Sequence, residues 1–352
     1  MMKKLTALLL AAAVVLGTAA AELPLVYPAE TVISVMRLTQ AQRELAEYLY
    51  APVLAGETKI ALPAGTRYDD VGPAMQSLML DYPELFHLHR EYTISYWQKK
   101  PEQAISVSPQ YRMDARRAEE LRAQLYQAAM VLVRQGGTAV GLHDALAECT
   151  AYGGDTEMRH TAVGALLQGT ATCEGYAQAL SLLYRMAGIP CGVVKGVGTE
   201  YMTGRQTAHA WNIMYLGGYS LIDATWNDQD GAGLNTHWYF GLSDEQMAAD
   251  HTPDAEMDMP RSTDHAGWHR RYGRYAAQAE DAFRAMSDLV AYGTPVNLRV
   301  TDGALYAAIA EDIGGFMDAY NEWCPEGLAF YGRYTYMTCD AQQCLIIDRA
   351  GE

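Results

Sequence analysis

One stretch of this chain restricts its fold more than any other: a helix that begins at a cysteine, followed by three strands. Apolar side chains recur at helical spacing after Cys173 until a Gly-x-Pro sequence, which predicts a helix with Thr172 as its N-cap. Three segments rich in β-branched or alternating apolar residues then predict strands, over residues 191–197, 208–216 and 219–223. The stretch therefore predicts a helix packed on a small antiparallel sheet.

The last two strands carry a histidine and an aspartate, His209 and Asp223. The dipole at a helix N-terminus favours a negative sulfur, and a free cysteine has a pKa of about 8.5, so it needs such help to ionise at neutral pH. A nearby imidazole can take the thiol proton, and a carboxylate can fix the ring. The pattern thus predicts Cys173 as a nucleophile, His209 as its base and Asp223 as the orienting group.

The loop of the hairpin decides whether these groups meet. A two-residue loop would place the histidine and the aspartate on opposite faces of the sheet. A three-residue loop pairs Tyr215 with Tyr219, so that His209 lies opposite Thr225 and Asp223 becomes its diagonal neighbour. We expect the three-residue loop, or a bulge with the same effect.

The run C-E-G-Y-A from Cys173, then H-A-W-N from His209 and D-A-T-W-N-D from Asp223, resembles the transglutaminase-like superfamily, in particular its secreted bacterial branch. Residues 238–247 and 81–86 are similar to segments found in that branch. The resemblance implies an α+β fold with a papain-like core, in which the nucleophile-bearing helix packs on a small antiparallel sheet between accessory α+β domains. It also implies the same three catalytic residues.

Three further residues are candidates for the oxyanion hole or the substrate groove. Gln168 lies five residues before the cysteine, as a glutamine does in papain-like enzymes, although a polar helix end is the simpler interpretation. Tyr176 and Trp211 are candidates for groove walls, although most aromatic residues pack in cores.

Two patterns resemble metal sites only in part. His87 and His89 flank one residue of an expected strand without a third ligand, so we interpret them as partly exposed strand histidines. Residues 228–231 resemble the start of a calcium loop but lack its closing glutamate. We expect neither a metal nor a cofactor.

The chain divides into five expected segments and carries helix and strand patterns throughout. The segments are a signal peptide (1–21), an accessory α+β domain (22–113), a catalytic domain (114–252), a linker (253–275) and a small α+β domain (276–352). Besides those above, helices are expected over 39–51, 71–80, 114–135, 143–150, 159–167, 276–292 and 304–323, and strands over 92–97, 104–108, 295–301, 328–338 and 343–348. Thr39 and Gln42 resemble a capping box at the start of the first of these helices.

Residues 1–21 have the charged start, short apolar run and small-residue end of a secretory signal, with cleavage expected after Ala21. No later apolar run reaches the length of a membrane span. The formal net charge of −16 becomes −18 when Lys3 and Lys4 are removed with the signal. Such acidity argues against nucleic acid and anionic membranes as partners.

Six cysteines in an exported chain can form disulfides, but a free nucleophile leaves five, which cannot all pair. Cys339 and Cys344 flank an expected strand turn and could pair with each other. Cys149, Cys191 and Cys324 are interpreted as small buried residues.

These features predict a secreted thiol acyl-transfer enzyme. Cys173 would attack a peptide or glutamine carboxamide carbonyl, and water or an amine would resolve the thioester, which gives a peptidase or amidase in one case and a cross-linking transglutaminase in the other. The expected partners are proteins or peptides, including cell-wall peptides. The alternative is a non-catalytic cell-surface or cell-wall binding protein on the same fold.

Overall fold

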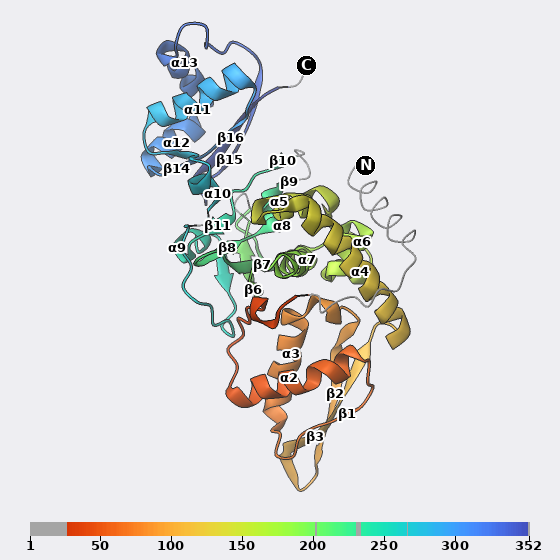
Figure 1. Cartoon of the computed structure of the whole chain (residues 1–352). Coiled ribbons are helices and arrows are strands. Elements are labelled where there is room, and N and C mark those ends of the chain that lie inside the picture. Colours follow the sequence, from red (N-terminus) through yellow and green to blue (C-terminus); the bar gives the residue numbers. More distant parts are fainter. Residues whose placement is uncertain (1–26, 201–202, 230–233, 266, 351–352) are drawn as a thin grey trace.

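The computed structural model describes residues 27–200, 203–229, 234–265 and 267–350. It has an α+β fold in three parts that follow one another along a long axis (Figure 1): an N-terminal unit (27–113), a central unit (114–265) and a C-terminal unit (267–350). The expected signal peptide lies outside the described residues. None of the described helices combines the length and the apolar character that a membrane crossing requires.

The N-terminal unit packs two helices on a three-stranded sheet in the order β1-β3-β2. The predicted capping box is present, because Thr39 accepts the backbone N–H of Gln42, whose side chain bonds back to the Thr39 N–H. The unit contains α2 (Gln40–Leu54), β1 (Ile60–Ala61), α3 (Tyr68–Asp81), β2 (Leu88–Trp97) and β3 (Lys100–Tyr111).

The central unit is built on a five-stranded antiparallel sheet in the order β11-β8-β7-β6-β12. Helix α7 (Cys173–Met186) is buried over most of its length between this sheet and helices α4 to α6 (Figure 1). The strands are β6 (Cys191–Thr199), β7 (Gln206–Tyr215), β8 (Tyr219–Ile222), β11 (Phe240–Leu242) and β12 (His251–Pro253), and the covering helices are α4 (Ala115–Gly136), α5 (Ala139–Cys149) and α6 (Ala162–Gln168).

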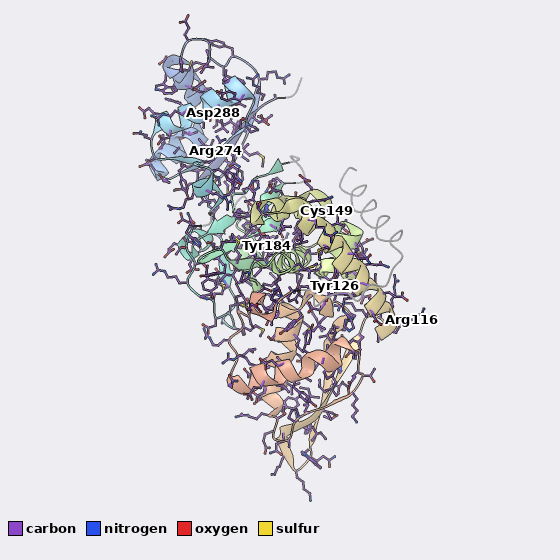
Figure 2. The ribbon with its side chains drawn as sticks, viewed as in Figure 1. Arg116, Tyr126, Cys149, Tyr184, Arg274 and Asp288 are labelled. Atoms are coloured by element: carbon purple, nitrogen blue, oxygen red, sulfur yellow. The ribbon has the colours of Figure 1, made fainter. Side chains whose placement is uncertain are left out.

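Figure 2 illustrates the contrast between the interior and the surface of this unit. Tyr184 of α7 and Cys149 of α5 are buried in its core, whereas Arg116 projects from the first turn of α4 with a highly exposed side chain. Helix α5 begins four residues earlier than predicted because Thr138 caps it through the backbone N–H of Gly141. The predicted helix 159–167 is a 3₁₀ turn, η3 (Glu157–His160), followed by α6.

The β7–β8 hairpin has the three-residue loop that was predicted. Tyr215 pairs with Tyr219, and the Leu216 N–H donates to the Gly218 carbonyl. The predicted position of Thr225 opposite His209 is wrong. Strand β8 ends before Asp223, and Thr225 belongs to the short helix α8 (Ala224–Asn227).

Two polar side chains of α7 join the central unit to the N-terminal unit. Gln178 donates its amide to the carbonyls of Met79 and Leu80 at the end of α3. The fully buried Arg185 donates to the carbonyls of Asp81 and Cys191. Helix α7 is therefore one of the parts of the central unit that fix the position of the N-terminal unit.

The C-terminal unit has a four-stranded sheet in the order β13-β14-β16-β15, covered by helices. The helix predicted over 304–323 is two helices, because Asp312 ends the first and caps the second through the N–H of Gly315. The elements are α10 (Trp268–Arg271), β13 (Tyr275–Ala276), α11 (Ala279–Tyr292), β14 (Val296–Val300), α12 (Gly303–Glu311), α13 (Ile313–Trp323), β15 (Tyr334–Cys339) and β16 (Cys344–Arg349).

The cysteines are free thiols. Cys339 and Cys344 are opposite each other in the β15–β16 ladder, but each sulfur bonds elsewhere, to Tyr239 and to a backbone carbonyl. Cys149 and Cys191 are buried as predicted, whereas Cys324 is half-buried.

One histidine prediction is also wrong. His87 precedes β2, is fully buried and bonds through Nε2 to the Val53 carbonyl, whereas His89 is partly exposed as expected. Burial is the main cause that lowers the pKa of His87 to about 4.

Candidate active site

Cys173 is the first residue of α7 and is half-buried. Thr172 has the extended backbone of an N-cap, but its hydroxyl does not cap the helix and instead bonds to His160 Nδ1 at 2.8 Å. The first N–H groups of a helix lack acceptors within it, so the amides next to Cys173 are available to an oxyanion. The position therefore favours a thiolate and can stabilise the charge that forms when it attacks a carbonyl.

His209 lies on β7 with its Nε2 at 2.6 Å from Asp223 Oδ2. Both side chains are almost completely buried. This bond leaves Nδ1 as the ring nitrogen available to Cys173. Gly198 on the neighbouring strand β6 makes room for the ring, since a Cβ there would stand 3.3 Å from the Cβ of His209 and 2.9 Å from the Trp226 ring.

Asp223 is held in place by its role as the N-cap of α8. Its Oδ1 accepts the backbone N–H groups of Thr225 at 2.8 Å and Trp226 at 3.1 Å, which leaves Oδ2 for histidine. Strand pairing therefore ends at Asp223, whose carboxylate binds both the backbone of α8 and the His209 ring. The same side chain ends β8, starts α8 and orients His209.

The three groups change one another's ionisation. Burial alone would lower the pKa of His209, but the Asp223 carboxylate and then the Cys173 sulfur raise this pKa from 6.5 to about 10. Burial would raise the pKa of Asp223, but His209 and His251 hold it well below its usual value. At neutral pH the resting site therefore contains an imidazolium between a carboxylate and the sulfur.

The cleft beside Cys173 has charged and aromatic walls that come from several parts of the chain. Tyr152 has a 58% exposed side chain, and its pKa is raised by burial and by the charges of Cys173 and Asp223. Arg90 of β2, His160 of η3, Lys195 of β6 and Asp254 after β12 also line this cleft, together with residues of α7 and β7.

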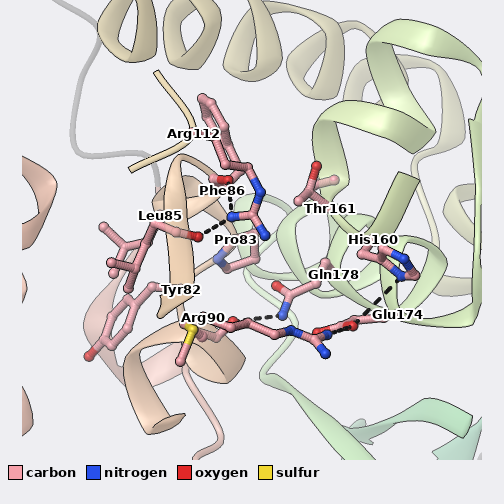
Figure 3. A pocket seen from close by; sticks show the side chains of 13 residues that line it. Tyr82, Pro83, Leu85, Phe86, Arg90, Arg112, His160, Thr161, Glu174 and Gln178 are labelled. Carbon is pink, nitrogen blue, oxygen red and sulfur yellow. Dashed lines mark hydrogen bonds and ion pairs between the residues drawn. The ribbon is translucent and has the colours of Figure 1, made fainter. Parts of the chain in front are cut away.

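Glu174 follows the nucleophile, and its charge would oppose a thiolate if it were unpaired. It forms an ion pair with Arg90 of β2, and His160 Nδ1 lies 4.0 Å from its carboxylate (Figure 3). Lys195 Nζ lies 3.5 Å from the same carboxylate. A neighbouring hollow between the N-terminal and central units shares Arg90, His160 and Glu174 with the Cys173 cleft. The ion pair of Arg90 and Glu174 thus lies where the two hollows meet.

The three other candidate residues do not line the Cys173 cleft, so these predictions are wrong. Gln168 is exposed at the end of α6, where its amide oxygen accepts the Thr156 hydroxyl. Tyr176 is fully buried and donates to the Thr150 carbonyl and the Asp228 carboxylate. Trp211 is 1% exposed and packs beneath His209.

Sequence reasoning missed His251, the first residue of β12. Its Nε2 lies 3.1 Å from Asp223 Oδ2, the same oxygen that binds His209. His251 lies outside the H-A-W-N and D-A-T-W-N-D motifs, and the residues around it indicate only an ordinary strand. Only the pairing of β12 with β6 brings it beneath the site.

Among the described residues, two His–Asp–His clusters have donor types that zinc accepts: His209, Asp223 and His251, and the separate set His143, Asp144 and His237. In the second cluster, His143 Nδ1 and His237 Nε2 lie 2.9 and 2.6 Å from Asp144 Oδ1. Atoms that share a zinc ion lie farther apart, at about 3.3 Å. These distances are those of direct hydrogen bonds, and we assign both clusters to hydrogen bonding. Residues 230 and 231 of the loop that resembles a calcium site lie outside the described part.

Residues 133–227 match the family model of the transglutaminase-like superfamily. Human kyphoscoliosis peptidase is 34% identical to this chain in an alignment 100 positions long that covers 23% of this chain, and its mouse counterpart is equally similar. The chain spans 14% of the length of these curated relatives.

Solved structures show weaker similarity. The periplasmic domain of TgpA from Pseudomonas aeruginosa is 20% identical with a TM-score of 0.23, and the match covers 36% of this chain and 55% of that one. A structure described as a TGase is 14% identical with a TM-score of 0.25, and the match covers 40% of this chain and 45% of that one.

The matched segment contains the cysteine, the histidine and the aspartate that meet at the N-terminus of α7. Members of this superfamily are cysteine peptidases or transglutaminases. Residues 133–227 of this chain are therefore similar to the transglutaminase-like superfamily.

Proposed function

We propose that this protein is a cysteine-dependent acyl-transfer enzyme that acts on peptide or glutamine carboxamide bonds through a thioester. One observation carries the proposal: Cys173 stands at the N-terminus of α7 beside His209, which Asp223 holds at 2.6 Å. A nucleophile, a base and a group that orients the base are the parts that acyl transfer requires.

The reaction follows from these positions. The Cys173 thiolate attacks the carbonyl carbon, and amides of the first turn of α7 face the resulting oxyanion. The C–N bond then breaks, and His209 gives its proton to the leaving amine, so that a thioester remains on Cys173. In the second half, His209 takes a proton from the acceptor, which attacks the thioester and releases the thiolate. Asp223 keeps the ring oriented in both halves.

The cleft supports water as the acceptor. Arg90, Lys195, Glu174 and Asp254 line it, and a wall of charged side chains attracts water to the acyl group. Transfer to an amine requires that water be kept away from the thioester. We therefore propose hydrolysis, by a peptidase or amidase, over cross-linking.

The proposed substrates are proteins or peptides, including cell-wall peptides, and the proposed location is outside the cytoplasm. The location rests on the composition of residues 1–21. Intact-mass analysis of the protein from cells that express the full chain tests it: a chain that begins at Glu22 supports export, and a chain that retains residues 1–21 contradicts it.

Two measurements test the enzyme. Iodoacetamide at about pH 6 should label Cys173 at least tenfold faster than it labels a free cysteine, because the N-terminus of α7 and the His209 ring lie beside its sulfur. A peptide library incubated with and without a labelled amine should then give hydrolysed products and little amine incorporation, and Cys173→Ala should abolish both.

Cys324→Ala is the matched control, because this half-buried thiol lies in the C-terminal unit. It should leave activity and Cys173 labelling unchanged. Labelling of Cys173 at the rate of a free thiol, together with unmodified peptides, would refute the enzyme and favour a binding protein. Efficient amine incorporation would refute hydrolysis alone.

A further inference from the structure

Asp223 serves two histidines with a single oxygen. Its Oδ2 lies 2.6 Å from His209 Nε2 and 3.1 Å from His251 Nε2, while Oδ1 is occupied by two backbone N–H groups. A carboxylate oxygen accepts, so both ring nitrogens must carry a proton. His209 and His251 therefore share the negative charge of Asp223. The mechanism above gives no role to the bond between Asp223 and His251.

The second nitrogen of His251 also faces a carboxylate. Its Nδ1 lies 2.6 Å from Asp250 Oδ1, and Asp250 Oδ2 accepts the Tyr239 hydroxyl at 2.6 Å. A neutral imidazole has one N–H, so a ring that donates to two carboxylates carries both protons and a positive charge. The His251 side chain is completely buried, where a cation is stable only with such partners.

The groups around His251 are consistent with a fixed cation. Asp223 approaches from the start of α8 and Asp250 from the residue before β12. The rings of Trp226 and Trp211 lie 4.4 and 4.9 Å away, and those of His209 and Tyr239 lie 5.3 and 5.5 Å away. Burial opposes the charge, but the two carboxylates together raise the pKa of His251.

We propose that His251 is a positioning residue that remains protonated throughout the reaction, holds Asp223 beside His209 and offsets part of the carboxylate charge. The role rests on the proposed function. His209 must release its proton to the leaving amine and later regain one, so a carboxylate that acted on His209 alone would hold that proton too firmly. The cation of His251 keeps His209 able to transfer protons in both directions.

The pH dependence of Cys173 alkylation tests the charge of His251. The rate should rise in two steps, first as the thiolate–imidazolium pair forms and then as His209 loses its proton. His251→Gln removes a cation whose ring lies 5.3 Å from that of His209, so the second step should move upward by about one pH unit. A packing role alone would loosen Asp223 and move the second step downward, so a downward shift or an unchanged profile overturns the proposal.

His87→Gln is the matched control, because it replaces another buried histidine, in the N-terminal unit, that bonds to a backbone carbonyl. Its alkylation profile should equal that of the unaltered protein. A profile that moves in the control as it does in His251→Gln would overturn the proposal, because the shift would then reflect the loss of any buried histidine.

A second measurement needs no stable variant. In the unaltered protein with ¹⁵N-labelled histidine, NMR should show the His251 ring, identified by its contact with Tyr239, with both nitrogens protonated from about pH 6 to pH 8. A neutral His251 ring at pH 7 overturns the proposal. Slow alkylation of Cys173 in the same sample would refute the proposed enzyme without affecting this result, so the two failures are distinguishable.

Discussion

Arg90 of the N-terminal unit forms an ion pair with Glu174, the residue that follows the nucleophile. The two residues are 84 positions apart in the sequence, and the Glu174 side chain is 17% exposed. The pair neutralises a carboxylate in the first turn of α7, where an unpaired negative charge would disfavour the Cys173 thiolate. The N-terminal unit therefore contributes directly to the electrostatics of the cleft.

Arg90→Ala should lower the alkylation rate of Cys173 at about pH 6 by roughly two- to tenfold, because Glu174 keeps only weaker partners. Removing the carboxylate as well, in Arg90→Ala with Glu174→Gln, should restore the rate. Arg116→Ala is the control, since this exposed arginine of α4 lies away from the cleft. An unchanged rate in Arg90→Ala would show that the ion pair does not influence the sulfur.

Asp223→Asn should reduce the turnover number by about 10³- to 10⁴-fold, as loss of the orienting carboxylate does in related triads. The amide oxygen can still cap α8, so the variant should still fold, but the loss of the buried charge beside His209 and His251 should lower its thermal unfolding temperature. Asp302→Asn is a matched control because Asp302 caps α12 in the same way, through the N–H of Leu305. Equal losses of activity in the two variants would point to a general effect of losing an aspartate cap.

Local signals in the sequence predicted the centre of the fold. The capping box at Thr39, the helix start at Cys173 and the glycine-containing hairpin loop each depend on residues a few positions apart. The hairpin register that brings Asp223 to His209 followed from the loop length alone. These features were predictable because the interactions that fix them lie within one helix turn or one hairpin.

The parts that sequence reasoning missed depend on contacts between distant segments. His251 reaches Asp223 through the pairing of β12 with β6, and Arg90 reaches Glu174 through the docking of the N-terminal unit. Tyr176 faces the core because Thr150 and Asp228 supply acceptors there. The spacing of apolar residues predicts which face of a helix is buried, but it does not predict which segment of the chain packs on that face.

The contribution of His209 and Asp223 to stability should depend on pH. The folded-state pKa of His209 is raised, so its stabilisation is complete below 6.5 and is lost as the pH rises toward about 10. The folded-state pKa of Asp223 is lowered, so its stabilisation is present above 3.8 and is lost as the pH falls. The pair therefore contributes most between about pH 4 and pH 6.5.

His209→Gln should lower the free energy of unfolding by about 2 kcal/mol in that range, and the difference from the unaltered protein should shrink toward pH 10. Urea unfolding at a series of pH values measures this difference. His269→Gln offers a comparison, since burial lowers the pKa of His269 well below its usual value. A difference for His209→Gln that grows with rising pH would contradict the assigned ionisation.

Arg185 should be the most sensitive position at the junction of the N-terminal and central units. Its guanidinium donates to two backbone carbonyls, lies 5.5 Å from the centre of the Tyr27 ring and partly offsets the buried Asp81 charge. Arg185→Met should lower the free energy of unfolding by about 3 kcal/mol, because it leaves carbonyls and a carboxylate buried without their partner. Adding Asp81→Asn should recover part of the loss, since the two residues are coupled.

Urea unfolding measures both effects, and Arg116→Met, at an exposed site of α4, should lower the free energy of unfolding by less than about 0.5 kcal/mol. A loss in Arg185→Met no larger than that of Arg116→Met would show that α7 does not hold the N-terminal unit through this side chain.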